Sequence, residues 1–130
     1  KPDGVEGDTM RFRIELQGDI NLIHPVGNFD GGRDCEQLQG LIADMAASGC
    51  RKVVFSFYQT RWINSCGVGR LIAAKFHFDR FGGRFVLCDF NSRSMSVLNK
   101  LRVDEVFEIY GSLSEGIAAL KQDQAVSAGS

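Results

Sequence analysis

Residues 62–69 read Trp-Ile-Asn-Ser-Cys-Gly-Val-Gly, and this stretch joins a predicted strand to a predicted helix. The apolar run at 52–58, which precedes it, is typical of a strand buried on both faces. From 68 to 81 the apolar residues recur at helical spacing. Ser65 therefore lies in a tight turn at a helix start, where backbone N–H groups lack partners within the helix. A hydroxyl there suits a modification site, a nucleophile or an anion site.

The composition indicates one ordinary globular domain. The chain has 130 residues, of which 44% are hydrophobic and 24% charged. Its 15 basic and 16 acidic residues give a net charge of −1, which argues against direct nucleic-acid binding or attachment to an anionic membrane. No apolar run approaches the roughly 20 residues of a membrane span. We therefore expect a cytoplasmic protein.

The order of predicted elements is ββαβαβαβα. Turn residues at Gly18 and Asp19 predict that the first two strands form an antiparallel hairpin, and alternation places Phe12, Ile14 and Leu16 on one face of the first strand. The remaining elements are a helix at 33–48, the strand at 52–58, the helix at 68–81, a strand at 84–89, a helix from 91, a strand at 105–110 and a helix at 112–122.

Helices that alternate with strands imply parallel pairing over the second half of the chain. The predicted fold is a single α/β domain with a mixed sheet of about five strands and helices mainly on one face. We assign residues 10–122 to this domain, 1–9 to an N-terminal extension or artificial remnant, and 123–130 to a flexible C-terminal tail.

Two interpretations of the Ser65 turn remain open from the residues. Asn64 or Ser65 can be a helix N-cap, which contributes roughly 1 kcal/mol to stability. Alternatively, Ser65 is a phosphorylation acceptor, because a helix N-terminus tolerates a phosphate and the group adds about −1.5 to −2 charges. A partner packed against that turn would then be released by repulsion and desolvation.

A third interpretation makes Cys66 the nucleophile of a thiol enzyme, since a helix N-terminus lowers a thiol pKa. The two candidate bases are His24 and His77. His77, however, follows 11 residues later on the same helix, roughly 16 Å away. Nucleophile and base must touch, so we expect no enzyme. The four cysteines also lack the close spacing of a zinc or redox motif, and no metal or cofactor is expected.

Polar and aromatic residues are predicted to gather around Ser65. The carboxyl ends of parallel strands share one sheet edge, which brings Asp30 near Ser65. Phe29 and Trp62 lie on the same loops and either join a docking patch or serve as buried loop anchors. Asp30, Asn64, Ser65, Cys66 and Gly67 form the rest of the predicted contact surface.

Ordered motifs over residues 10–120 give the chain a family resemblance. Residues 27–30, Gly-Asn-Phe-Asp, resemble the pattern G-x-(L/F)-D, and residues 63–69 resemble (I/M)-D-S-(S/T)-G-(L/I/V)-G. The stretch Gly-Gly-Arg-Phe-Val-Leu at 82–87 also matches. In these motifs the chain resembles the STAS domain of bacterial anti-sigma factor antagonists and of sulfate transporters.

The resemblance implies a non-catalytic partner switch. Its kinase partner, an anti-sigma factor, would phosphorylate Ser65 and release the antagonist, and a PP2C-type phosphatase would reset it. Three positions depart from the family pattern: Asn64 and Ser56 stand where Asp is common, and Cys66 replaces Ser or Thr. The alternative is a STAS module of a transport or lipid-handling system that binds a partner or small ligand without phosphorylation. The sequence leaves open whether two copies associate.

Overall fold

The structure, a computed structural model, describes residues 11–129, apart from the side chains of residues 33–35 and 122–129. Its elements are, in chain order, β1 (Arg11–Gln17), β2 (Ile20–Phe29), α2 (Arg33–Ala47), β3 (Lys52–Ser56), β4 (Thr60–Ile63), α3 (Ser65–Asp79), β5 (Arg84–Cys88), α4 (Ser92–Lys100), the 3₁₀ turn η1 (Val103–Glu105), β6 (Glu108–Tyr110) and α5 (Leu113–Gly129). The expected extension at 1–9 lies outside the described residues.

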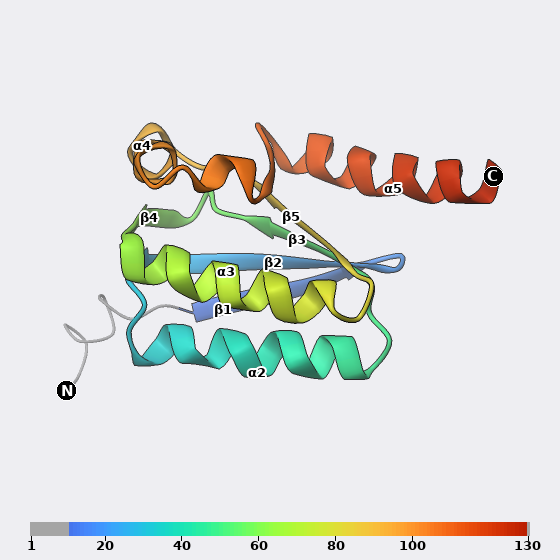
Figure 1. Ribbon diagram of the computed structural model, residues 1–130, viewed down its shortest axis with the longest axis horizontal. Helices are drawn as coiled ribbons and strands as arrows, with labels where there is room; N and C mark the ends of the chain where they lie inside the picture. Colours follow the sequence, from blue (N-terminus) through green and yellow to red (C-terminus); the bar gives the residue numbers. More distant parts are fainter. Residues whose placement is uncertain (1–10, 130) are drawn as a thin grey trace.

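The sheet is mixed, as the sequence predicts. Its main strands run in the order β1-β2-β3-β5-β6, and β4 pairs with the end of β2 (Figure 1). The β1–β2 hairpin is antiparallel and turns at Gly18, whose φ of 64° favours glycine. The other pairs are parallel. The predicted α/β class is therefore confirmed.

Helices cover both faces of this sheet. Helices α2 and α3 lie side by side on one face, and α5 lies on the other, over β3, β5 and β6 (Figure 1). The larger core, beneath α2 and α3, includes Phe55, Phe78 and Leu71. A smaller core beneath α5 contains Val54 and Leu120. The sequence predicts helices mainly on one face, and α2 and α3 do share a face. Helix α5 covers the opposite face.

Several boundaries differ from the expected ones. β4 occupies part of the predicted connector, because Thr60 donates a hydrogen bond of 2.8 Å to the Pro25 carbonyl and so attaches this short strand to β2. Helix α3 begins at Ser65, three residues before the predicted start. Helix α5 continues to Gly129, through most of the expected tail at 123–130. Flexibility of that tail stays a prediction.

The predicted inner face of β1 is only partly buried. Phe12 packs edge-on against Phe29, with ring centroids 6.1 Å apart. Ile14 and Leu16, nearer the hairpin turn, are 45% and 70% exposed. β1 is the edge strand, so alternation alone could not reveal how far the helices extend over it.

The core beneath α2 and α3 predicts a strong contrast between two aromatic residues. We expect Phe55→Ala, at a fully buried ring, to lower the free energy of unfolding by about 3–5 kcal/mol. Tyr58→Ala, at a ring that is 63% exposed, should lower it by less than about 0.5 kcal/mol. Urea denaturation measures both values. Similar losses for the two variants would contradict the described core.

Candidate functional site

The candidate site lies where the ends of β2 and β4 meet the first turn of α3. Phe29 of β2 pairs with Ile63 of β4, and the Asn64 N–H donates to the Phe29 carbonyl at 3.2 Å. Asp30 and Asn64 each follow one of these paired strands. The two strand ends are therefore held together by backbone bonds before any side chain contributes.

Asn64 is the N-cap of α3. Its Oδ1 accepts a hydrogen bond from the Gly67 N–H at 2.9 Å, and its backbone is extended. Ser65 is the first helical residue, and its side chain is exposed. The cap and the exposed hydroxyl thus belong to separate residues, so the two interpretations of this turn are compatible.

Gly67 brings α3 into direct contact with β2. A Cβ on Gly67 would overlap the carbonyl oxygen of Phe29 and lie 2.8 Å from its ring carbon Cδ1. Phe29 itself is fully buried, and its ring packs at a tilt against Phe57, with ring centroids 5.8 Å apart. A buried ring cannot contact a partner, so the docking interpretation of Phe29 is wrong. Its ring is part of the core beneath α3 and anchors the loop. Gly67 is also buried, and it supports the surface from below.

The loop that carries Asp30 lies against the same helical turn. At Gly31, whose φ is 80°, a Cβ would lie 2.5 Å from the Cβ of Cys66. Asp30 Oδ1 accepts from the Gly32 N–H at 3.0 Å, which closes the loop on itself. The structure therefore brings the Asp30 loop and the Ser65 turn together. Asp30 is partly exposed.

Arg70 is a site residue that sequence reasoning missed. Its Nε donates to the Gly31 carbonyl at 3.4 Å, and its guanidinium pairs with Glu36 at 3.4 Å. Its own carbonyl accepts from Gln39 at 3.1 Å. Arg70 thus joins α2, α3 and the Asp30 loop. The available signal was a basic residue directly after the motif at 63–69.

A carboxylate lies beside Ser56, on the residue that follows β5. Ser56 is buried and donates to Asp89 Oδ2 at 2.7 Å, across the β3–β5 pair. Asp89 has a φ of 66°, an uncommon conformation for a residue with a side chain. Burial, reinforced by Asp89, raises the pKa of the neighbouring Cys88 thiol to about 12. Cys88 is therefore an unreactive core residue.

The remaining predicted contacts are Trp62 and Cys66. Trp62 is half-buried, and Cys66 is exposed. Of the candidate bases, His24 Nε2 lies 2.6 Å from Glu15 Oε1, and His77, at the far end of α3, packs against Phe81. Among the described residues, no hydrogen bond joins either histidine to Cys66, as the thiol-enzyme alternative would require. Those residues also include no cluster of His, Cys, Asp and Glu suited to a metal ion.

Comparison with known families assigns the domain. The STAS domain model matches residues 11–116, and the chain therefore belongs to the STAS family. STAS domains are generally non-catalytic. No protein of curated function matches the chain. Among the described helices, none combines the length and apolar character that crossing a membrane requires.

Solved structures of similar fold include anti-sigma factor antagonists. One, from Mycobacterium paratuberculosis, is 16% identical, with a TM-score of 0.75 over 88% of this chain and 96% of that one. RsbS of Moorella thermoacetica, in a variant form, is 16% identical, with a TM-score of 0.76 over 88% and 98%. The Bacillus cell fate determinant SpoIIAA, in its phosphorylated form, is 18% identical, with a TM-score of 0.64 over 85% and 99%. At these identities the likeness establishes a shared fold.

Two glycines of α3 provide a test of the contact with β2. We expect Gly67→Ala to destabilise the domain by about 2–3 kcal/mol, because the new methyl group meets the Phe29 backbone. Gly69→Ala, where a Cβ would meet nothing within 4 Å, should stabilise the helix by up to about 1 kcal/mol. Chemical denaturation of both variants measures this difference. Equal effects would mean that α3 does not touch β2 as described.

Proposed function

We propose that the protein is an anti-sigma factor antagonist whose partner binding is controlled by phosphorylation of Ser65. The partner in this proposal is an anti-sigma factor that is also a serine/threonine kinase, and a PP2C-type phosphatase restores the unmodified form. The protein acts in the cytoplasm, by contact with proteins rather than with nucleic acid. The observation that carries the proposal is the exposed Ser65 side chain at the first position of α3.

The helix start can accept a phosphate without losing its cap. Asn64 already satisfies the Gly67 N–H, so the N–H groups of Ser65 and Cys66 remain to face an anion. A phosphate at this end also interacts favourably with the helix dipole. Phosphorylation is therefore compatible with the folded domain, and its effect would fall on whatever packs against the turn.

The charge change at this surface would be large. Asp30 is the one acidic residue among the members of the predicted contact set that are at least partly exposed, which are Asp30, Trp62, Asn64, Ser65 and Cys66. A phosphate adds about −1.5 to −2 charges and so at least doubles the negative charge there. A partner covering the turn would have to desolvate this group, which favours release. SpoIIAA, which has the same fold, is known in a phosphorylated form, and this supports the proposal by analogy.

The second candidate, a ligand-binding STAS module, has one observation in its favour. A cavity of about 290 Å³ lies between β6 and the start of α4, lined by Phe90, Met95, Ile109, Tyr110 and Gly111. This lining is largely apolar. Saturable binding of a fluorescent fatty acid, lost in Met95→Asp, together with no phosphate on Ser65, would favour this function.

Phosphate mapping with a matched serine tests the primary proposal. Ser92 is also an exposed first helical residue after an asparagine cap, since Asn91 accepts from the Ser94 N–H at 2.8 Å. With an anti-sigma kinase from the same genome and ATP, mass spectrometry should locate phosphate on Ser65 and none on Ser92. Ser65→Ala should abolish incorporation. Phosphate on another residue, from a kinase that is active on a control substrate, would refute the assignment.

Ser65 and Ser92 also distinguish the effect of a charge at the contact surface from the effect of a charge at any helix start. Ser65→Asp should weaken the complex with that kinase by at least tenfold in titration calorimetry, while the melting temperature stays within about 2 °C. Ser92→Asp makes the same chemical change at α4 and should leave affinity unchanged. Equal affinity of Ser65→Asp and the unmodified protein would contradict the proposed surface.

A further inference from the structure

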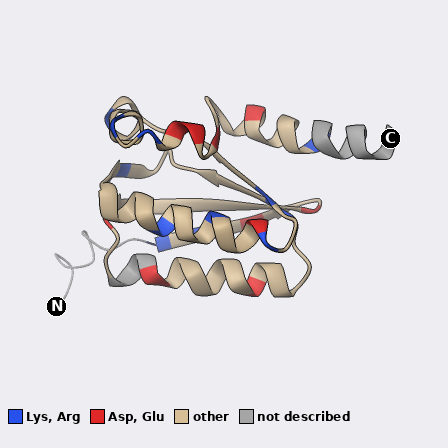
Figure 2. Ribbon diagram, in the orientation of Figure 1, with Lys and Arg blue, Asp and Glu red and all other residues tan. Residues whose placement is uncertain are grey.

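A second surface, away from the Ser65 turn, is formed by the residues that join α4 to β6. We call it the α4–η1 surface and define it by its exposed residues Lys100, Leu101, Arg102, Asp104, Glu105 and Val106. Its first half is basic and its second half acidic. Figure 2 shows the basic end of α4 meeting the acidic residues of η1.

The backbone places these two halves next to each other. Arg102 has a φ of 60°, in the left-handed region that favours glycine, and it is the residue from which η1 begins. The chain reverses there, so that the basic end of α4 is followed at once by Asp104 and Glu105. A charged side chain thus occupies a position where glycine would be less strained. Such strain often marks a functional surface.

The charges of the α4–η1 surface are available to a partner. Within the described residues, Lys100, Arg102, Asp104 and Glu105 form no ion pair with one another or with other side chains. On the adjacent surface, by contrast, the charged residues are paired: Lys75 with Asp79 at 2.7 Å, and Arg84 with Glu108.

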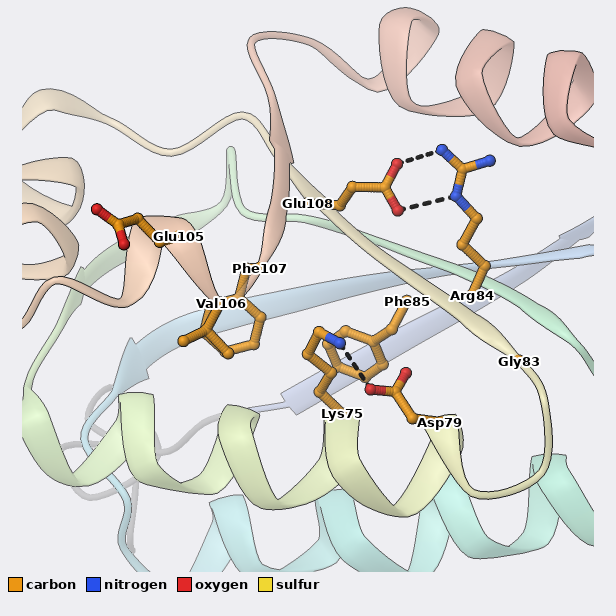
Figure 3. Close-up of a pocket in the computed structure, with 9 residues that line it drawn as sticks. All are labelled: Lys75, Asp79, Gly83, Arg84, Phe85, Glu105, Val106, Phe107 and Glu108. Atoms are coloured by element: carbon orange, nitrogen blue, oxygen red, sulfur yellow. Dashed lines mark hydrogen bonds and ion pairs between the residues drawn. The ribbon is translucent and has the colours of Figure 1, made fainter.

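Apolar groups lie between and beside these charges. Leu101 is 41% exposed and Val106 40% exposed. Val106 lines a cavity of about 240 Å³ whose lining also includes Phe85 and Phe107 (Figure 3). Charged residues of both signs complete the lining of this cavity, namely Lys75, Asp79, Arg84, Glu105 and Glu108. The surface therefore presents an exposed apolar side chain, a hollow and both signs of charge.

We propose that a second copy of this chain covers the α4–η1 surface in a two-fold symmetric dimer. In such an interface the same patch meets itself, so each basic half faces the acidic half of the other copy, and every contact occurs twice. Leu101 of each copy enters the cavity of the other and packs against the rings of Phe85 and Phe107. Lys100 and Arg102 then face Glu105 across the interface. The net charge of −1 opposes association only weakly.

The distribution of charge favours a second copy over other occupants. An anionic membrane or a nucleic acid would meet Asp104 and Glu105 as well as the basic half and would be repelled there. A uniformly acidic or basic protein would leave half of the charges buried and unpaired. Only a surface with the same alternation matches both halves, and the chain itself supplies that surface.

The cavity in the proposed interface does not include the Ser65 turn, and the dimer does not depend on the proposed function. Lys75, which lines the cavity, follows Ser65 by ten residues along α3, or roughly 15 Å. Each dimer would thus present two Ser65 turns.

Paired charge reversal tests this inference with the full chain and no other component. Sedimentation velocity should show a dimer whose dissociation constant rises at least tenfold between 50 mM and 500 mM NaCl, because salt screens the ion pairs. The double variants Lys100→Glu/Arg102→Glu and Asp104→Lys/Glu105→Lys should each be monomeric, since like charges face each other. Mixing the two variants should restore a dimer. Asp44→Lys, at an exposed residue of α2, is the matched control and should dimerise normally.

Leu101→Asp, which places a charge against the cavity rings, should also be monomeric while its circular dichroism spectrum and melting curve remain those of a folded domain. The inference is overturned if the unmodified chain stays monomeric up to about 1 mM, where even a weak interface is half formed. It is equally overturned if folded charge-reversed variants dimerise alone, or if their mixture stays monomeric.

Discussion

The close approach of Gly67 to the Phe29 carbonyl is the contact on which the site depends. No side chain separates the start of α3 from the end of β2, so the helix begins directly on the sheet edge. The Asn64 N–H bond to the same carbonyl fixes the direction in which α3 leaves β4. Ser65 is exposed because its neighbours make the contacts with the fold. Asn64, before it, caps the helix, and Gly67, two residues after it, packs against the Phe29 carbonyl. A small hydroxyl thus stands on a rigid support.

This arrangement explains how one modification could act on a partner without refolding the domain. The support consists of backbone hydrogen bonds, the buried Phe29 ring and the Asp30 loop. That loop packs closely against Cys66 at Gly31. None of these contacts uses the Ser65 side chain, so a phosphate there would alter charge and shape outside the fold. Arg70 ties the loop to α2 and α3 and limits how far the loop can move. The same rigidity would present an unchanged surface to kinase and phosphatase.

The order of elements could be predicted because hydrophobic periodicity and turn residues determine it locally. Gly18, Gly49 and the run at 52–58 are sufficient signals for the hairpin, a helix end and the central strand. β4 could not be predicted, since its four residues become a strand only through pairing with β2. The burial of Phe29 and the role of Arg70 depend on packing between segments far apart in sequence. The carboxylate beside Ser56 was missed for the same reason, because Asp89 lies at the end of β5 and is 33 residues away in sequence.

The central claim, that Ser65 lies on a support which its modification does not disturb, is best tested by comparing ¹H–¹⁵N NMR spectra of the protein before and after phosphorylation. The account predicts amide shifts confined to residues 30–32 and 64–68 and hydrogen-exchange protection in β3 and β5 that does not change. Shifts spread through the core strands, or lost protection of α3, would contradict it.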